Sequence, residues 1–338
     1  MSRLRIAFCG TPPFAVPPLQ KLIEQSDFEI AAVFTQPDRP RGRGQEVSFS
    51  AVKEAALAAR LPVHQPVKVR APEVDELLRT LAPEVIVIIA YGQIIPARLL
   101  TIPRLGWINL HASLLPKYRG AAPINWAIAN GEAVTGNTTM RIDAGMDTGE
   151  MLLQQELPIG PEETAPELAE RLARGGADLM LDTLRGLQAG TIAPRPQDHF
   201  AATLAPILKR EDGQIDWTRP AREIYNRIRG FAPWPGAFTE FRGQTCHVWG
   251  RPLAERSASH AAPELAEGGP RKDRTVSNDV AGEAPGTLLA RHDQVLVACG
   301  AATVLELTHV KLEGRKQVTA RAFANGARLR PGERFGNS

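Results

Sequence analysis

Apolar residues in the first 190 positions follow two alternating patterns. Nearly continuous apolar runs of strand length alternate with segments in which apolar residues recur every three or four positions, as on one face of a helix. This alternation predicts an α/β domain with a doubly wound, mainly parallel, Rossmann-like sheet. The expected strands are Leu4–Cys9, Ile30–Phe34, Leu61–His64, Val85–Ala90, Trp107–Leu110, Thr138–Ile142 and Met151–Leu157. One helix is expected to begin at Pro17. Further helices are expected at Ala51–Arg60, Glu73–Leu81, Ile124–Ala129 and Ala165–Leu187.

The pattern changes after residue 190. Residues 190–206 are rich in proline and predict a linker. One helix is expected at 222–229, and short strand-like runs between glycines and prolines then predict a small, OB-like β-barrel. We therefore expect a first domain at 1–189, a linker at 190–206 and a second domain at 207–338. Residues 255–283 carry mostly Ala, Ser, Glu, Gly, Lys and Arg, which predicts a disordered insertion at a loop tip.

Composition places the chain among ordinary globular proteins. It has 338 residues, 43% hydrophobic and 23% charged, which is enough for two domains with a sizeable core. The longest apolar run, Val85–Ala90, is too short to span a bilayer, and the N-terminus lacks the features of a signal peptide. The cysteines Cys9, Cys246 and Cys299 form no CxxC pair, so we expect neither a disulfide framework nor a zinc site. Because a reducing compartment suits such a chain, we expect a cytoplasmic location.

Positive charge is concentrated in the C-terminal part. Residues 1–200 carry 20 Lys and Arg against 22 Asp and Glu, whereas residues 201–338 carry 20 against 15. Without the stretch 255–283, the C-terminal part carries 16 against 9. This excess favours a polyanionic partner, although a solvated basic surface is an equally open interpretation of charge alone.

Nucleotide-binding motifs are incomplete or absent. Gly10-Thr11-Pro12 follows the first expected strand, where a dinucleotide-binding fold would carry GxGxxG, but the later glycines are missing. No Walker sequence is present. The loop 39–44, RPRGRG, is either a solvated surface loop or a finger that contacts phosphate through Arg41 or Arg43.

Three polar residues could converge on one carbonyl carbon. Asn109 and His111 stand at the end of an expected strand, and Asp147 follows about 35 residues later in a glycine-bounded loop. An amide can hold a carbonyl oxygen, an imidazole can stabilise or transfer charge, and a carboxylate can orient the imidazole. Taken alone, each residue is more often structural: a strand-end asparagine, a buried histidine or a turn-forming aspartate. A metal site is not expected because no second histidine stands at a useful spacing.

Longer motifs around these residues resemble the folate-dependent formyltransferases. The carriers of the resemblance are INLHASLLP at 108–116, RGAAPI at 119–124 and DAGMDTG at 143–149. The resemblance implies that Asn109, His111 and Asp147 are catalytic and that no Ser or Cys nucleophile takes part. It also implies a folate-binding segment formed by Ser113, Leu114, Leu115 and Pro116. Ile94 could wall the pterin pocket or belong to the core.

Further motifs indicate the substrates within that family. GTP at 10–12, FTQPDRP at 34–40, the RGRG loop and FAPWPGA at 231–237 are similar to members that use initiator methionyl-tRNA as the acceptor. The resemblance implies 10-formyltetrahydrofolate as the donor and no metal. The neutral α-amine of methionine would attack the formyl carbon directly, Asn109 and His111 would contact the resulting oxyanion, and Asp147 would orient His111.

The basic second domain would then bind the tRNA. Lys311, Arg315 and Lys316 lie near a glycine turn and are candidate contacts, together with Arg41 and Arg43. Nothing in the sequence demands more than a monomer. Three alternatives stay open: a formyltransferase for a small amine such as a nucleotide sugar or a glycinamide ribotide, a hydrolase of formylfolate, and an RNA-binding protein without catalysis.

Overall fold

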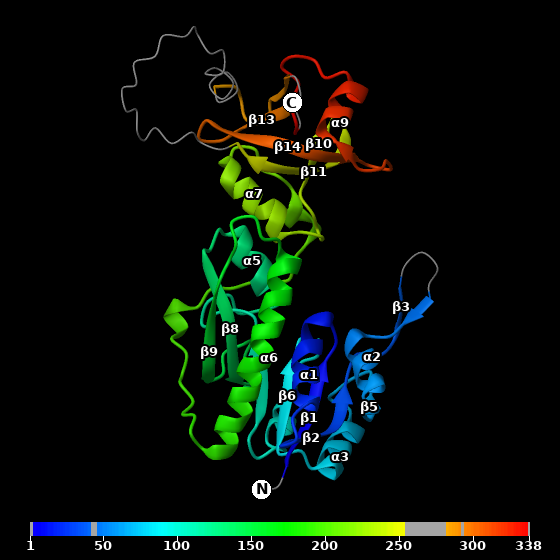
Figure 1. Ribbon diagram of the computed structural model, residues 1–338, viewed down its shortest axis with the longest axis vertical. Coiled ribbons are helices and arrows are strands. Elements are labelled where there is room, and N and C mark those ends of the chain that lie inside the picture. The colour runs from blue at the N-terminus through cyan, green and yellow to red at the C-terminus, as the bar shows by residue number, and fades with distance from the viewer. Residues whose placement is uncertain (1–2, 42–45, 254–281, 292–293, 337–338) are drawn as a thin grey trace, which may run out of the picture. The chain divides into compact units, whose positions relative to one another are not determined.

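The computed structural model describes residues 3–41, 46–253, 282–291 and 294–336 (Figure 1). The chain divides into two compact units. The first comprises Met1–Ala127 and Glu132–Ile207, and the second comprises Ile128–Gly131 and Leu208–Ser338. Arg43 and most of the expected insertion at 255–283 lie outside the described residues.

A seven-stranded sheet forms the centre of the first unit. Its strands are β1 (Leu4–Gly10), β2 (Phe28–Phe34), β5 (Val63–His64), β6 (Val85–Ile89), β7 (Trp107–His111), β8 (Val134–Arg141) and β9 (Met151–Pro158). Their order is β5-β2-β1-β6-β7-β8-β9. The first five strands in this order pair in parallel, whereas β8 is antiparallel to β7 and β9 is antiparallel to β8. The predicted doubly wound, mainly parallel α/β sheet is therefore confirmed.

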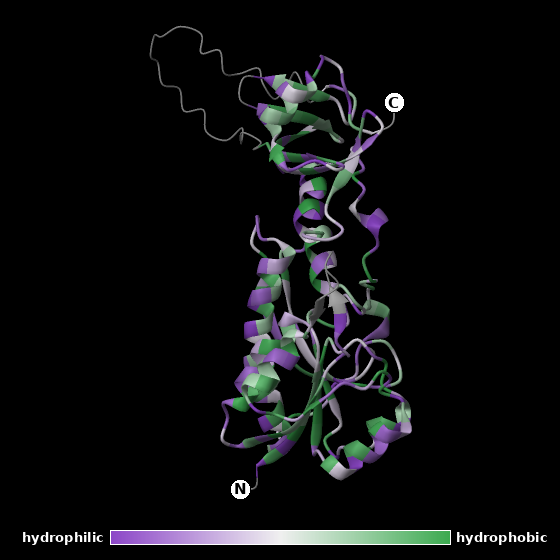
Figure 2. Ribbon diagram, turned by 90° about the vertical axis from the view of Figure 1, so that its right-hand side faces the viewer, coloured by the Kyte–Doolittle hydropathy of each residue, from purple (hydrophilic) through white to green (hydrophobic). Residues whose placement is uncertain are grey.

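Helices cover both faces of this sheet because its strands are apolar on both sides (Figure 1). Successive strand residues point to opposite faces. In β1, Ile6 and Phe8 join one core layer, and Ala7 and Cys9 join the other. The first layer packs against α1 (Val16–Ile23), α2 (Ala51–Ala58) and α6 (Ala165–Ala189), and the second packs against α3 (Pro72–Leu81) and α4 (Ala97–Leu100). In Figure 2 the central strands are correspondingly green, whereas the helices also carry purple residues.

Several small elements complete the first unit. The hairpin of β3 (Arg39–Arg41) and β4 (Glu46–Ser48) is not predicted by the sequence, and only its first strand lies in the segment 39–44 that is expected to be a loop. α4 was also not predicted, because one helical turn is too short to show a period. The remaining elements are the 3-10 turns η1 (Pro13–Ala15) and η2 (His199–Ala201) and the helix α5 (Pro123–Ala129), whose last two residues belong to the second unit.

The segment 190–206, which we expected to be a linker, lies within the first unit. Arg195 exchanges two backbone hydrogen bonds with Met151 of β9, each 2.8 Å long. Arg119 pairs in the same way with Thr203 and Ala205, at 2.9 and 2.7 Å. These contacts fasten the segment to the sheet and to the loop after β7. The domain limits at 189 and 206 stay a prediction.

Within its described residues, the second unit is an antiparallel sheet with two helices. Its elements are η3 (Arg210–Gly213), α7 (Ala221–Gly230), β10 (Phe238–Phe241), β11 (Gln244–Pro252), β12 (Leu288–Arg291), β13 (Gln294–Cys299), β14 (Thr303–Leu312), β15 (Val318–Thr319) and α9 (Ala320–Ala327). The strand order is β10-β11-β14-β13-β12, and β15 also pairs with β14. The domain is barrel-like, as expected, but the described ranges contain no closed barrel. β15 and α9 were not predicted.

Apolar side chains from both helices and the sheet form one core in this second unit. Ile224 and Ile228 of α7 and Phe323 of α9 pack with Val248 and Val310 from the strands. No helix in the described ranges has the length and apolar character needed to cross a membrane.

Candidate active site

The strand β7 presents two polar side chains on one face of the sheet. Asn109 and His111 are two residues apart, so their side chains project to the same side. Trp107, which precedes them by the same interval, packs in the apolar layer on that side. Asn109 is half-buried and His111 is 6% exposed. Both lie where β7 ends, at the edge of a parallel sheet at which ligands bind in doubly wound folds.

A cavity of about 830 Å³ opens at this edge. Asn109, His111 and Asp147 all line it, so the structure brings the three predicted catalytic residues to one space. The other walls are largely apolar and come from the ends of β1 and β6, the loop after β7 and the loop after β8. They include Phe14, Ile88, Tyr91, Ile94, Ile95, Ala122, Pro123, Ile124, Ile142 and Met146.

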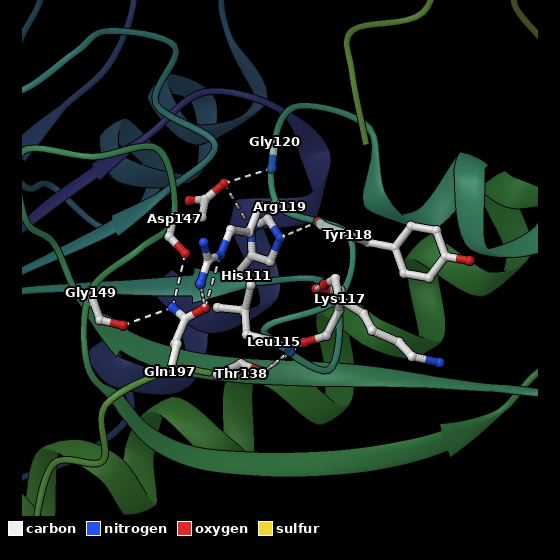
Figure 3. A network of polar contacts seen from close by, with 11 residues as sticks. His111, Leu115, Lys117, Tyr118, Arg119, Gly120, Thr138, Asp147, Gly149 and Gln197 are labelled. Carbon is white, nitrogen blue, oxygen red and sulfur yellow. Dashed lines mark hydrogen bonds and ion pairs between the residues drawn. The ribbon is translucent and has the colours of Figure 1, made fainter. Parts of the chain in front are cut away.

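His111 is held by contacts on both ring nitrogens (Figure 3). Its Nε2 lies 2.8 Å from the backbone oxygen of Tyr118, and because a carbonyl only accepts, Nε2 carries the proton. Its Nδ1 lies 3.7 Å from Oδ2 of Asp147. The imidazole is thus fixed in orientation, and its second nitrogen faces a carboxylate.

Asp147 reaches this position from a left-handed backbone conformation. Its φ angle is +52°, which is uncommon for a residue with a side chain. Its Oδ2 accepts a hydrogen bond of 2.8 Å from the backbone N–H of Gly120. Gly149 ends the loop where its backbone approaches strand β8, and a Cβ there would lie 1.9 Å from the Arg141 carbonyl oxygen. The glycine is therefore required by this close approach.

Two residues that the sequence did not single out also hold this loop. Gln197 donates from Nε2 to the backbone oxygens of Asp147 and Gly149, at 2.9 and 2.7 Å. Arg119 donates to Oε1 of Gln197 (Figure 3). Gln197 stands in the proline-rich segment that predicted a linker, and no periodicity or motif marks it. Arg119 stands in the RGAAPI motif, which was the available signal.

The predicted folate segment and Ile94 differ in their relation to the cavity, and folate binding by the segment stays a prediction. Ser113, Leu114, Leu115 and Pro116 are not among the residues that line the cavity, whereas Ile94, 93% exposed, is. Ser113 is fully buried and its hydroxyl donates to the backbone oxygen of Lys117, which closes the turn. The Leu115 N–H donates to the Thr138 hydroxyl of β8. These bonds hold the turn against β8.

Cysteine nucleophiles are not available at this site. Burial raises the pKa of the Cys9 thiol, and also the pKa of the Tyr91 hydroxyl, far above the ordinary values. Burial likewise raises the pKa of Cys246 and of Cys299 to about 12. These thiols stay protonated near neutral pH, and a protonated thiol is a poor nucleophile. Within the described part of the chain, no three His, Cys, Asp or Glu side chains gather in a way that could hold a metal ion.

A second cavity, of about 440 Å³, adjoins the first. Both are lined by Ala90, Tyr91 and Gly92. Arg39 also lines the smaller cavity, and strand β3 leads from it to Arg41. Space for a second reactant therefore exists beside the one that holds Asn109 and His111.

Three of the basic residues predicted for tRNA, Lys311, Arg315 and Lys316, lie in the second unit. Lys311 is exposed on β14, and Arg315 and Lys316 are exposed in the turn that follows. Across the strand pair, Lys311 is in register with His247 of β11. Burial, and then the charges of Lys311 and Arg210, lower the pKa of His247. Cationic groups are thus concentrated on this part of the sheet.

Comparison with solved structures supports the fold. A sugar 3N-formyltransferase, WlaRD, aligns with a TM-score of 0.62 and 18% identity, over 94% of this chain and 100% of that one. An N-formyltransferase from Helicobacter canadensis, in complex with folinic acid and dTDP-3-aminofucose, aligns with a TM-score of 0.61 and 16% identity, over 91% and 99%. At such identities the likeness establishes the architecture.

Sequence comparisons identify the family. The family model described as formyl transferase matches residues 4–184, and the model of the formyl transferase C-terminal domain matches residues 207–328. The methionyl-tRNA formyltransferase of Solibacter usitatus is 53% identical over 98% of this chain and 99% of its own length. The methionyl-tRNA formyltransferase of Geobacter sulfurreducens is 46% identical over 100% and 98%. The chain that places Asn109, His111 and Asp147 around one cavity therefore belongs to the formyl transferase family, and within it to the methionyl-tRNA formyltransferases.

Proposed function

We propose that this chain transfers a formyl group from 10-formyltetrahydrofolate to the α-amino group of methionine on initiator methionyl-tRNA, for the initiation of translation. The observation that carries the proposal is the convergence of Asn109, His111 and Asp147 at one cavity in a chain 53% identical to a protein of this name. No step requires a side-chain nucleophile or a metal.

The larger cavity suits the folate. Ligand pockets of this class measure roughly 300–1,000 Å³ and combine apolar walls with a few polar groups, and this cavity of about 830 Å³ falls in that range. We infer that Ile88, Ile94, Ile95 and Ile142 contact the flat pterin ring, with Asn109 at the formyl end. The segment 113–116, which the sequence indicated for folate, stays a prediction beside this set.

Transfer needs one bond formed and one broken at the formyl carbon. The neutral amine attacks this carbon, and the carbonyl electron pair moves to the oxygen. Asn109 donates a hydrogen bond to that oxygen, and a protonated His111 supplies a second contact there through Nδ1, because its Nε2–H is engaged by the Tyr118 carbonyl. When the bond between carbon and N10 breaks, its electron pair stays on N10, which takes up the proton that the amine loses. Donors of this kind are worth about 3–4 kcal/mol each when water is excluded.

The acceptor also needs a surface for its phosphates. We infer that Lys311, Arg315 and Lys316 of the second unit contact the tRNA backbone, together with Arg41 and Arg43 of the RGRG motif. We further propose a monomer that acts in the cytoplasm. The three cysteines are free and buried, which suits a reducing compartment.

The decisive experiment is formyl transfer from 10-formyltetrahydrofolate to methionine-charged initiator tRNA. The controls are His111→Ala protein and uncharged tRNA. Formyl-methionine should appear only with the wild-type protein and the charged tRNA. Turnover of a small amine or of water, with charged tRNA left unmodified, would keep the formyl chemistry and discard the tRNA acceptor.

A further inference from the structure

A buried arginine lies directly behind the candidate catalytic loop. Arg119 is 6% exposed, and a guanidinium so far from water needs hydrogen-bond acceptors. Its Nε and Nη2 lie 3.0 and 2.7 Å from Oε1 of Gln197, which is itself 5% exposed. A positive charge is thus directed at the oxygen end of one neutral amide.

This contact fixes which way the Gln197 amide points. A guanidinium only donates, so the amide oxygen must face Arg119 and the NH₂ group must face the opposite side. There Nε2 lies 2.9 Å from the backbone oxygen of Asp147 and 2.7 Å from that of Gly149. One NH₂ group has two hydrogens, so it can donate a hydrogen bond to both carbonyls at once. Arg119 therefore orients a donor pair that grips the backbone of the loop.

The gripped backbone is a strained one. Asp147 has a φ angle of +52°, and a non-glycine residue keeps such a conformation only when its surroundings hold it there. From this conformation its carboxylate meets the Gly120 N–H at 2.8 Å and lies 3.7 Å from His111 Nδ1. If the backbone relaxed, the carboxylate would leave both partners.

Three consecutive residues, 118–120, contact His111, Gln197 and Asp147 (Figure 3). The Tyr118 carbonyl holds Nε2 of His111, the Arg119 side chain orients Gln197, and the Gly120 N–H holds the Asp147 carboxylate. The turn 118–120 thereby sets the position of the imidazole and of the carboxylate relative to each other.

We infer that Gln197 is a positioning residue, oriented by Arg119, which holds the Asp147 backbone in the conformation that brings its carboxylate to His111. Gln197 is not among the residues that line the cavity, so we expect it to act without contacting substrate. The inference rests on the proposed function, because the value of the position is a faster formyl transfer. It assigns a role in the reaction to a residue in the segment that the sequence predicted to be a linker.

Two substitutions separate positioning from simple support. Gln197→Ala removes both donors and leaves Arg119 without its acceptor, so it can also destabilise the fold. Gln197→Glu keeps an acceptor for Arg119 and forms an ion pair with it, but an ionised carboxylate cannot donate to the two carbonyls. The glutamate variant should therefore stay folded while the loop is released.

A matched control exists on the same unit. Gln25 also accepts from an arginine, Arg185, at 3.0 Å and donates to a backbone carbonyl, that of Lys21, at 3.1 Å. It does not line either cavity. Gln25→Ala removes the same kind of contact at a site where positioning is not involved, and its kinetics should match those of the wild type.

The test measures kcat and KM for charged initiator tRNA, the Kd for tetrahydrofolate, and hydrogen exchange at the Gly120 amide. For Gln197→Glu we expect kcat to fall roughly 10- to 100-fold, as misplacement of a catalytic group by about 1 Å would cause. We expect KM and Kd to change less than threefold and the Gly120 amide to exchange faster. An unchanged kcat, or a loss confined to KM or Kd, would overturn the inference.

The exchange measurement keeps this inference separate from the proposed function. If the wild-type protein transfers no formyl group but Gln197→Glu still exposes the Gly120 amide, the function is wrong and the hold on the loop is real. If the wild-type protein is active and Gly120 exchange is the same in both proteins, the hold itself is refuted.

Discussion

At the residue scale, the candidate site depends on a two-residue repeat in one strand. Because β7 turns its side chains alternately, Asn109 and His111 share a face, whereas Ile108 and Leu110 join the opposite core layer. The apolar pair anchors the strand, and the polar pair is thereby delivered to the cavity. Alternate positions of these five strand residues therefore face the cavity or pack in the core.

The amide of Asn109 should matter for rate rather than for binding. Asn109→Ala removes one hydrogen bond to an oxygen that becomes negative only as the amine attacks, so kcat should fall about 10²- to 10³-fold with little change in KM. Steady-state formylation of charged initiator tRNA gives both constants, and thermal unfolding checks the fold. A loss below tenfold would mean that another group stabilises the oxyanion.

At the element scale, apolar patterning predicted most of the first unit but could not show how its last strands run. The short apolar runs found every strand of the central sheet because these strands are buried on both faces or alternate regularly. The sequences of β8 and β9 do not predict that these strands pair antiparallel rather than parallel. The antiparallel pairing follows from hydrogen bonding to β7, which is a contact between distant segments.

In the candidate site, too, residues in local motifs were predictable, whereas residues that act through contacts between distant segments were not. Asn109, His111 and Asp147 belong to long motifs, and they do meet at one cavity. Gln197 became visible only in the structure, because its role depends on contacts with Arg119, 78 positions away, and with the loop around Asp147. The motif around Ser113 predicts a folate contact, and only the structure shows that its hydroxyl also donates to the Lys117 carbonyl within its own turn.

The pairing of β11 with β14 makes the second unit sensitive to acid. Burial, Lys311 and Arg210 lower the pKa of His247, so the folded chain binds this proton less readily than the unfolded chain does. As the pH falls below about 6.5, the unfolded state therefore gains the proton first and the free energy of unfolding decreases. Above that pH the histidine is neutral in both states and its contribution is constant.

His247→Gln removes this proton uptake. Its free energy of unfolding should fall less than that of the wild type between pH 7.5 and pH 5.5, and urea unfolding at several pH values measures the difference. Equal pH dependence in the two proteins would show that His247 does not titrate differently on folding.

At the scale of the whole molecule, the two parts of the chain differ in net charge. Residues 1–200 have slightly more acidic than basic groups, and the basic excess lies in residues 201–338. A folate and a methionine need few charges, whereas a tRNA presents one negative charge per nucleotide. The basic part is therefore expected to set the affinity for tRNA and its dependence on salt.

Replacing Lys311, Arg315 and Lys316 together by alanine tests this expectation. Each phosphate contact contributes about 0.7–0.9 to the slope of log affinity against log salt, so the slope should become shallower by roughly 2–3. Tetrahydrofolate binding should be unchanged. Lys21→Ala, which removes a cation paired with Asp178 in the first unit, is the control. An unaltered slope in the triple variant would place the tRNA elsewhere.

The assignment of Ile128–Gly131 to the second unit constrains how such enzymes can be recombined. The chain passes between the two units after residues 127, 131 and 207. A chimera that joins two homologues only near residue 207 would thus carry a short piece of one parent inside the folded body of the other. Evolutionary shuffling or engineering that exchanges this unit cleanly must transplant two separate stretches of gene, including the four codons embedded in the catalytic half.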